Sequence, residues 1–97
     1  MLRISEIGSG REAATLRLEG EVKGPWVKEL EIACERLLAE ARPVTLDLAE
    51  VSFVEREAVG VLIELMRREV KLINCSPFIA EQIKVASSSR ARSRESY

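Results

Sequence analysis

Residues 44–58, V-T-L-D-L-A-E-V-S-F-V-E-R-E-A, constrain the fold of this chain more than any other stretch. Val44, Leu46 and Leu48 alternate with polar residues, which is typical of a strand with one buried face. An apolar segment follows, and the glutamates Glu55 and Glu57 at its start complement the positive end of a helix dipole. The stretch therefore predicts a buried strand that leads, through a short loop, onto the N-terminus of an apolar helix.

The region before this strand is predicted to be a helix. At about 100° per residue, its apolar side chains fall within a stripe roughly 140° wide. These residues are Trp26, Val27, Leu30, Ala33, Cys34, Leu37, Leu38 and Ala41. Pro25 suits the first turn, where its missing N–H costs nothing, and the pair at 42–43, Arg-Pro, ends the helix.

The two ends of the chain complete the expected order of elements. Apolar residues alternate with polar ones on both sides of the Gly-Ser-Gly turn at 8–10, which predicts an antiparallel strand pair, and Val70 and Leu72 predict a further short strand. Ser76 and Pro77 are suited to the N-cap and first position of a last helix. The order β-β-α-β-α-β-α contains two right-handed βαβ crossovers. We therefore expect an α/β fold with a mixed four-stranded sheet and helices packed on it.

Length, charge and composition set limits on organisation and partners. A chain of 97 residues has room for one small domain, which we place at 1–85. Residues 86–97 are rich in serine and arginine and are predicted to form a disordered tail. A formal net charge of −1 gives no broad field that would attract nucleic acid or an anionic membrane. No signal core or membrane-spanning run is present, so we expect a cytoplasmic protein without membrane insertion.

Few residues offer catalytic or metal-binding chemistry. The chain has no histidine, which excludes Cys–His catalysis within it. Cys34 is expected in the core, and Cys75 is interpreted as a packed small thiol, with a reactive thiol near a helix N-terminus as the alternative. Asp47, Glu50 and Glu55 could form a carboxylate cluster, although solvated loop and cap roles suit the last two better. We expect no enzyme activity, no cofactor and no metal.

The apolar face of the helix after residue 55 is unusually wide. Its apolar side chains span roughly 200°, whereas a helix on a sheet needs little more than 100°. Val59 and Ile63 lie at the edge of this arc, so we expect them to be partly exposed and to form part of a partner or dimer surface. The alternative is that the first helix covers both side chains within the same domain.

The element order and several residues resemble the STAS domain, the fold of bacterial anti-anti-sigma factors. The matching residues are Asp47, Leu48, Val51, Phe53, Val54 and Glu55, within a D-L-x-x-V-x-F-V-D-S-x-G-like segment that opens a helix. The resemblance covers about residues 1 to 85. It implies a protein-binding regulatory module in bacterial signalling and the regulation of transcription.

The resemblance also marks a departure at residue 56. The family's phosphorylatable serine or threonine corresponds to Arg56, and its small residue two positions later corresponds to Ala58. A phosphate on the first turn of a helix is stabilised by free backbone N–H groups and by the helix dipole, whereas arginine carries a fixed positive charge. Arg56 is therefore interpreted as a contact to an acidic partner group, or alternatively as a solvated side chain paired with its neighbouring glutamates. Ser52 is the nearest hydroxyl, but it precedes the helix.

These observations favour a non-catalytic interaction module that resembles an anti-sigma factor antagonist and is not switched at the usual position. The candidate partner surface is formed by Glu55, Arg56, Glu57, Val59 and Ile63. By family resemblance, the expected partner is the kinase-like domain of an anti-sigma factor. The alternative is a constitutive STAS-like subunit that binds the ABC ATPase of a lipid transport complex.

Overall fold

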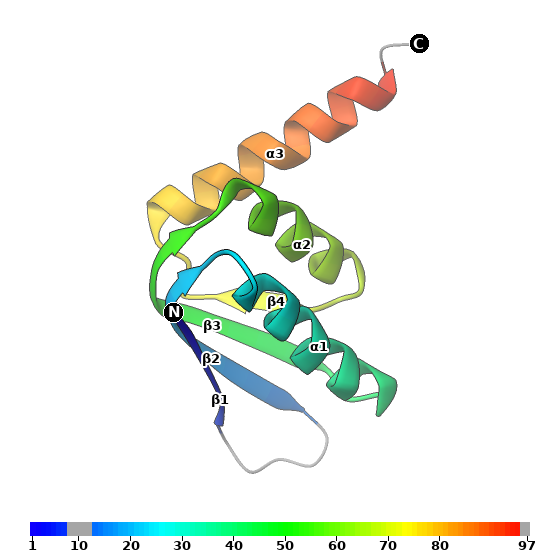
Figure 1. Cartoon of the computed structure of the whole chain (residues 1–97). Coiled ribbons are helices and arrows are strands. Elements are labelled where there is room, and N and C mark those ends of the chain that lie inside the picture. The colour runs from blue at the N-terminus through cyan, green and yellow to red at the C-terminus, as the bar shows by residue number, and fades with distance from the viewer. Residues whose placement is uncertain (8–12, 96–97) are drawn as a thin grey trace.

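The computed structural model describes residues 1–7 and 13–95, and it has the element order expected from the sequence. The strands are β1 (Leu2–Ile7), β2 (Ala14–Val22), β3 (Val44–Val54) and β4 (Lys71–Ile73). The helices are α1 (Trp26–Ala39), α2 (Arg56–Arg67) and α3 (Pro77–Glu95). The strands form one sheet in the order β1-β2-β3-β4 (Figure 1). The expected turn at 8–10 lies outside the described residues.

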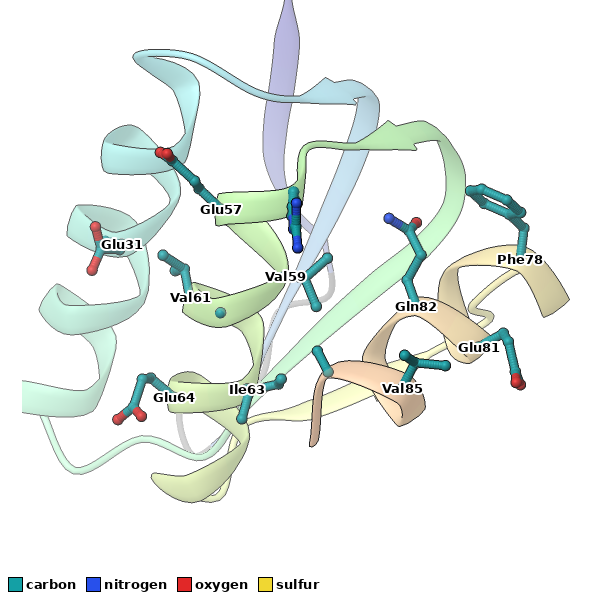
Figure 2. A pocket seen from close by; sticks show the side chains of 13 residues that line it. Glu31, Glu57, Val59, Val61, Ile63, Glu64, Phe78, Glu81, Gln82 and Val85 are labelled. Atoms are coloured by element: carbon teal, nitrogen blue, oxygen red, sulfur yellow. The ribbon is translucent and has the colours of Figure 1, made fainter. Parts of the chain in front are cut away.

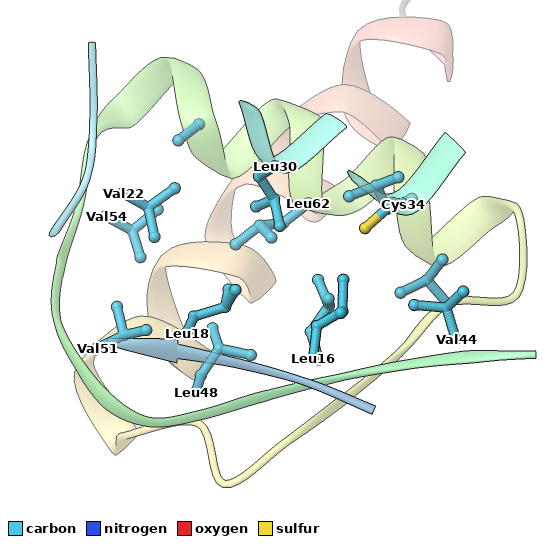
Figure 3. Packing of buried hydrophobic residues seen from close by; sticks show 14 of the residues in the cluster. Leu16, Leu18, Val22, Leu30, Cys34, Val44, Leu48, Val51, Val54 and Leu62 are labelled. Atoms are coloured by element: carbon cyan, nitrogen blue, oxygen red, sulfur yellow. The ribbon is translucent and has the colours of Figure 1, made fainter. Parts of the chain in front are cut away.

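The sheet is mixed, as predicted. β1 and β2 are antiparallel, whereas β2 pairs with β3, and β3 with β4, in parallel. The helix after β2 and the helix after β3 therefore both serve as crossovers between parallel neighbours. Both lie over the same face of the sheet, and α3 packs against α2 (Figures 1 and 3).

The core lies between that face and the helices. Leu18 from the sheet is fully buried together with Leu30 of α1 and Leu62 of α2 (Figure 3). Leu46 of β3 is fully buried as well. The opposite face is polar, because the register places Thr15 beside Thr45 and both strands alternate their side chains between faces. Every second side chain of these strands therefore packs against the helices, which explains why apolar residues recur with a period of two in the sequence.

β3 is longer than the sequence predicts. Its alternation ends at Leu48, yet the strand continues to Val54. The register with β2 shifts twice along this segment, and each shift leaves one extra residue in β3. Because of these bulges, Val51 and Val54 also face the core at intervals of three residues. Glu50 is therefore an exposed strand residue instead of the expected loop residue.

The last helix begins where the sequence predicts and ends later. The Oγ of Ser76 accepts a hydrogen bond from the N–H of Ile79 at 3.2 Å, which is the expected N-cap. Ile79 and Ile83 are buried on one face of α3. The helix continues to Glu95, through most of the segment predicted to be disordered, because no proline or glycine interrupts it. The division into a domain at 1–85 and a tail at 86–97 stays a prediction, and 96–97 lie outside the described residues.

Candidate functional site at the start of the second helix

The junction between β3 and α2 presents a short charged segment. Val54 is buried at the end of the strand, and Glu55 follows in an extended conformation as the residue before the helix. Arg56 and Glu57 then form the exposed start of α2. No residue from 55 to 63 carries a hydroxyl group, so no position on the first two turns of this helix can accept a phosphate ester.

Glu55 fixes this junction to the turn before α1. Its Oε2 accepts a hydrogen bond from the N–H of Gly24 at 3.1 Å, and its own N–H donates to the carbonyl of Val22 at 2.9 Å. Gly24 has a φ of 58°, a conformation that glycine adopts without steric cost. Glu55 is thus a bridge between two segments that are 31 positions apart in sequence.

Arg56 is exposed and forms no salt bridge with any of the described residues. The alternative drawn from the sequence was a solvated Arg56 paired with its neighbouring glutamates; the side chain is solvated, but this structure does not show the pairing. The carboxylate of Glu55 is held by Gly24, and Glu57 projects toward the α1 side of α2 (Figure 2). Arg56 thus presents an unneutralised guanidinium to solvent at the N-terminal end of α2.

The expectation that Val59 and Ile63 are partly exposed is wrong. Their side chains are only 3% and 6% exposed. Both lie on the α2 face that meets α3, where Figure 2 shows Gln82 and Val85 beside them. The third helix, not the first, therefore covers the excess width of the apolar arc. This cover could not be found from the periodicity of α2 alone, because it depends on where α3 docks.

A groove runs over the solvent side of α2, between α1 and α3. Its volume is about 860 Å³. Val59 and Ile63 contribute to its floor, and Phe78 and Val85 of α3 flank it with side chains that are 71% and 57% exposed (Figure 2). The periodicity of the sequence does not indicate this groove. Gly60, within the apolar run of α2, is the one local signal, because a helix interior seldom retains glycine without a reason.

The other chemically interesting residues have structural roles. Burial raises the pKa of the Cys34 thiol to about 11 and also raises the pKa of Cys75, so neither is a ready thiolate at neutral pH. Asp47, which is 8% exposed, accepts hydrogen bonds from the N–H of Ala49 at 3.0 Å and from Asn74 at 3.1 Å. These two bonds, the backbone one foremost, lower the pKa of Asp47. Asp47, Glu50 and Glu55 do not converge, and no metal-binding group occurs within 1–7 and 13–95.

The element order, the mixed sheet and the junction before α2 agree with one family. A family model described as "Mlab, STAS domain" matches residues 5–89. The chain belongs to the STAS domain family. This assignment confirms the resemblance drawn from the segment between Asp47 and Glu55.

A solved STAS-type structure gives the same fold. The structure of the anti-sigma factor antagonist SpoIIAA in its unphosphorylated form superposes with a TM-score of 0.70. The two chains are 18% identical, and the match covers 95% of this chain and 98% of that chain. A comparison with curated proteins found no match. In the part of the chain that the structure describes, no helix is long and apolar enough to cross a bilayer.

Proposed function

We propose that this STAS domain is a non-catalytic docking module that resembles an anti-sigma factor antagonist and is not switched by phosphorylation at the start of α2. The observation that carries the proposal is the exposed pair Arg56 and Glu57, in a helix start without a hydroxyl group. The guanidinium of Arg56 offers a permanent contact to an acidic group of a partner protein. Phosphorylation of a hydroxyl at such a position would reverse the local charge, and here that change cannot occur.

Two further features support docking at this junction. The Glu55–Gly24 hydrogen bond fixes the segment before the partner arrives, which lowers the conformational entropy lost on binding. Arg56 also has no salt bridge among the described residues, so a partner need not displace an internal pair. Both features suit a rigid recognition surface.

Co-purification from the native cell tests the proposal. Tagged wild-type protein and an Arg56→Glu variant are compared. Arg3→Glu is the matched control, because Arg3 is exposed on β1 and its side chain forms no salt bridge with the described residues. We expect a partner that is retained by wild type and by Arg3→Glu and is lost with Arg56→Glu. Equal recovery with all three proteins would contradict docking at Arg56.

The identity of the captured protein distinguishes the two classes of partner. A kinase-like anti-sigma factor would place the domain in the control of transcription, whereas an ABC ATPase would indicate the constitutive subunit of a transport complex. The sample is also incubated with ATP and native extract, and phosphopeptides are sought by mass spectrometry. Ser52 is exposed, and its Oγ donates to the carbonyl of Gly20 at 3.3 Å. Stoichiometric phosphate on Ser52 would show that the switch has moved to β3, and it would contradict a permanent docking contact at Arg56.

A further inference from the structure

Gly60 occupies the centre of α2 with open space where a Cβ would stand. Among the described residues, nothing outside the local helix lies within 4 Å of the position that a Cβ would take. Glycine is the least favourable residue for a helix interior apart from proline. Neither a left-handed backbone nor a close internal neighbour therefore accounts for the glycine. The space that it leaves opens directly into the groove between α1 and α3.

The groove combines an apolar floor with an acidic rim. The nearly buried Val59 and Ile63 lie at its base, and the exposed Phe78 and Val85 supply the accessible apolar surface at its flank. Every helix contributes to the rim: Glu31 from α1, Glu57 and Glu64 from α2, and Glu81 from α3 (Figure 2). Glu64 pairs with Arg67 at 3.6 Å, whereas Glu31, Glu57 and Glu81 form no salt bridge with the described residues. Arg56, at one end, is the one unneutralised cation of the described lining.

We propose that this groove binds a basic amphipathic helix of the partner protein, which packs its apolar stripe over Gly60 and directs lysine or arginine side chains to the glutamates of the rim. Because Gly60 has no side chain, a partner helix can approach the backbone of α2 closely. A helix also presents apolar residues along one stripe with charges beside it, which matches the floor and rim. The inference rests on the proposed function and names the chemistry of the partner segment.

Charge complementarity favours a basic helix over an acidic helix or a second copy of this chain. An acidic helix would meet four carboxylates, Glu31, Glu57, Glu64 and Glu81, and the one guanidinium of Arg56. Like charges across an interface are unfavourable. A second copy of this chain would leave acidic rims facing each other in a symmetric dimer. A basic segment neutralises the rim and removes Phe78 and Val85 from water at the same time.

Peptide binding measured by calorimetry and by amide chemical shifts tests the inference. The probe is a peptide of about 16 residues with leucine at helical spacing and lysines flanking the leucine stripe. A second peptide has every lysine replaced by glutamate, and a third has the first composition in scrambled order. We expect the lysine peptide alone to bind, with the largest shift changes at Gly60, Phe78 and Val85. Binding of all three peptides with similar affinity, or shifts centred elsewhere, would overturn the proposal.

Variants of the groove separate shape from charge. Gly60→Leu fills the space over α2 and is expected to weaken the lysine peptide at least about tenfold, as is usual for loss of a central contact. Gly60→Ala is the control for folding, and both variants are checked by thermal unfolding. Glu31→Lys with Glu81→Lys is expected to transfer the preference to the glutamate peptide. Glu50→Lys reverses one charge outside the groove, and it should leave binding unchanged, whereas Glu31→Lys alone should weaken the lysine peptide.

The native partner distinguishes failure of this inference from failure of the proposed function. Loss of the captured partner with both Arg56→Glu and Gly60→Leu supports docking along the whole groove. Retention with Gly60→Leu, but loss with Arg56→Glu, overturns the groove and leaves the docking function standing. A dimer in sedimentation analysis that Gly60→Leu dissociates, without peptide binding, would assign the groove to a second copy and overturn the proposal.

Discussion

Asn74 donates a hydrogen bond from its side-chain amide to the Oδ1 of Asp47 at 3.1 Å, and this bond joins β3 to the segment after β4. The same carboxylate oxygen accepts the N–H of Ala49 at 3.0 Å, next to the first bulge of β3. Asn74 has a φ of 57°, which asparagine tolerates better than most residues. The pair therefore stabilises two irregular backbone segments that position α2 and α3.

This arrangement predicts a component of acid sensitivity. The N–H of Ala49, and then the amide of Asn74, hold the pKa of Asp47 below its ordinary value. A depressed pKa contributes stability above the unfolded-state pKa of about 3.9, and that contribution is lost as pH falls through the folded-state pKa. Urea unfolding from about pH 7 to about pH 2.5 should show wild type losing stability faster than Asp47→Asn in the acid range. Parallel curves for the two proteins would contradict this role.

The bond between Glu55 and Gly24 makes a second prediction. Glu55→Ala should lower the free energy of unfolding by about 0.5–1 kcal/mol, because the N–H of the exposed Gly24 exchanges a carboxylate partner for water. Glu57→Ala removes a similar charge from the same helix turn without breaking a described hydrogen bond, so it should cost only a few tenths of a kcal/mol. Chemical denaturation of both variants measures the difference. Equal losses would show that the dipole, and not the bond, accounts for the effect of Glu55.

Gly20 is required by the close approach of β1. Its φ is 108°, and a Cβ there would collide with the carbonyl oxygen of Met1. Gly20→Ala should therefore destabilise the protein by more than about 2 kcal/mol. Gly24 also has a positive φ, but a Cβ there would meet no described residue within 4 Å. Gly24→Ala should cost only about 1 kcal/mol, and thermal unfolding that ranks the two variants in the opposite order would contradict the collision.

The burial of Ile63 can be tested by comparison with Ile32, an exposed isoleucine of α1. Ile63→Ala removes a core side chain and should cost about 2–4 kcal/mol. Ile32 on α1 is 46% exposed, so Ile32→Ala should cost well under about 1.5 kcal/mol. Urea unfolding gives both values. A small loss for Ile63→Ala would mean that α3 does not cover this face in solution and would restore the sequence-based expectation of an exposed edge.

Strands and helices could be predicted where they depend on a local pattern of side chains. Val44, Leu46 and Leu48 alternate, and the Ser76 cap is a local hydrogen bond, so both were predictable. The continuation of β3 was not, because the bulges change the spacing of core residues from two to three. Bulges depend on pairing with β2, which a local pattern does not contain.

The part of the candidate site that lies within one segment was also predictable, whereas the part that depends on contacts between helices was not. Glu55, Arg56 and Glu57 follow a recognisable strand, and the structure places them together at the start of α2. The burial of Val59 and Ile63 depends on the position of α3, which brings residues from beyond 76 against a helix that ends at Arg67. The groove has the same origin, since its lining comes from all three helices. Because α3 docks on α2, Val59 and Ile63 are core residues instead of candidate contact residues. Phe78 and Val85 of α3 are the apolar side chains exposed beside them.

Gly60 is expected to show opposite effects on stability and on binding. Gly60→Ala should raise the free energy of unfolding by about 0.5–1 kcal/mol, because alanine favours the helix and its methyl group meets no described neighbour. Urea denaturation measures the gain, and Gly24→Ala, whose positive φ predicts a loss, is the control of opposite sign. A loss of stability in Gly60→Ala would show that the fold itself needs this glycine. A gain would mean that the chain keeps a less stable residue at the groove, which is expected when the space above Gly60 is used by a partner.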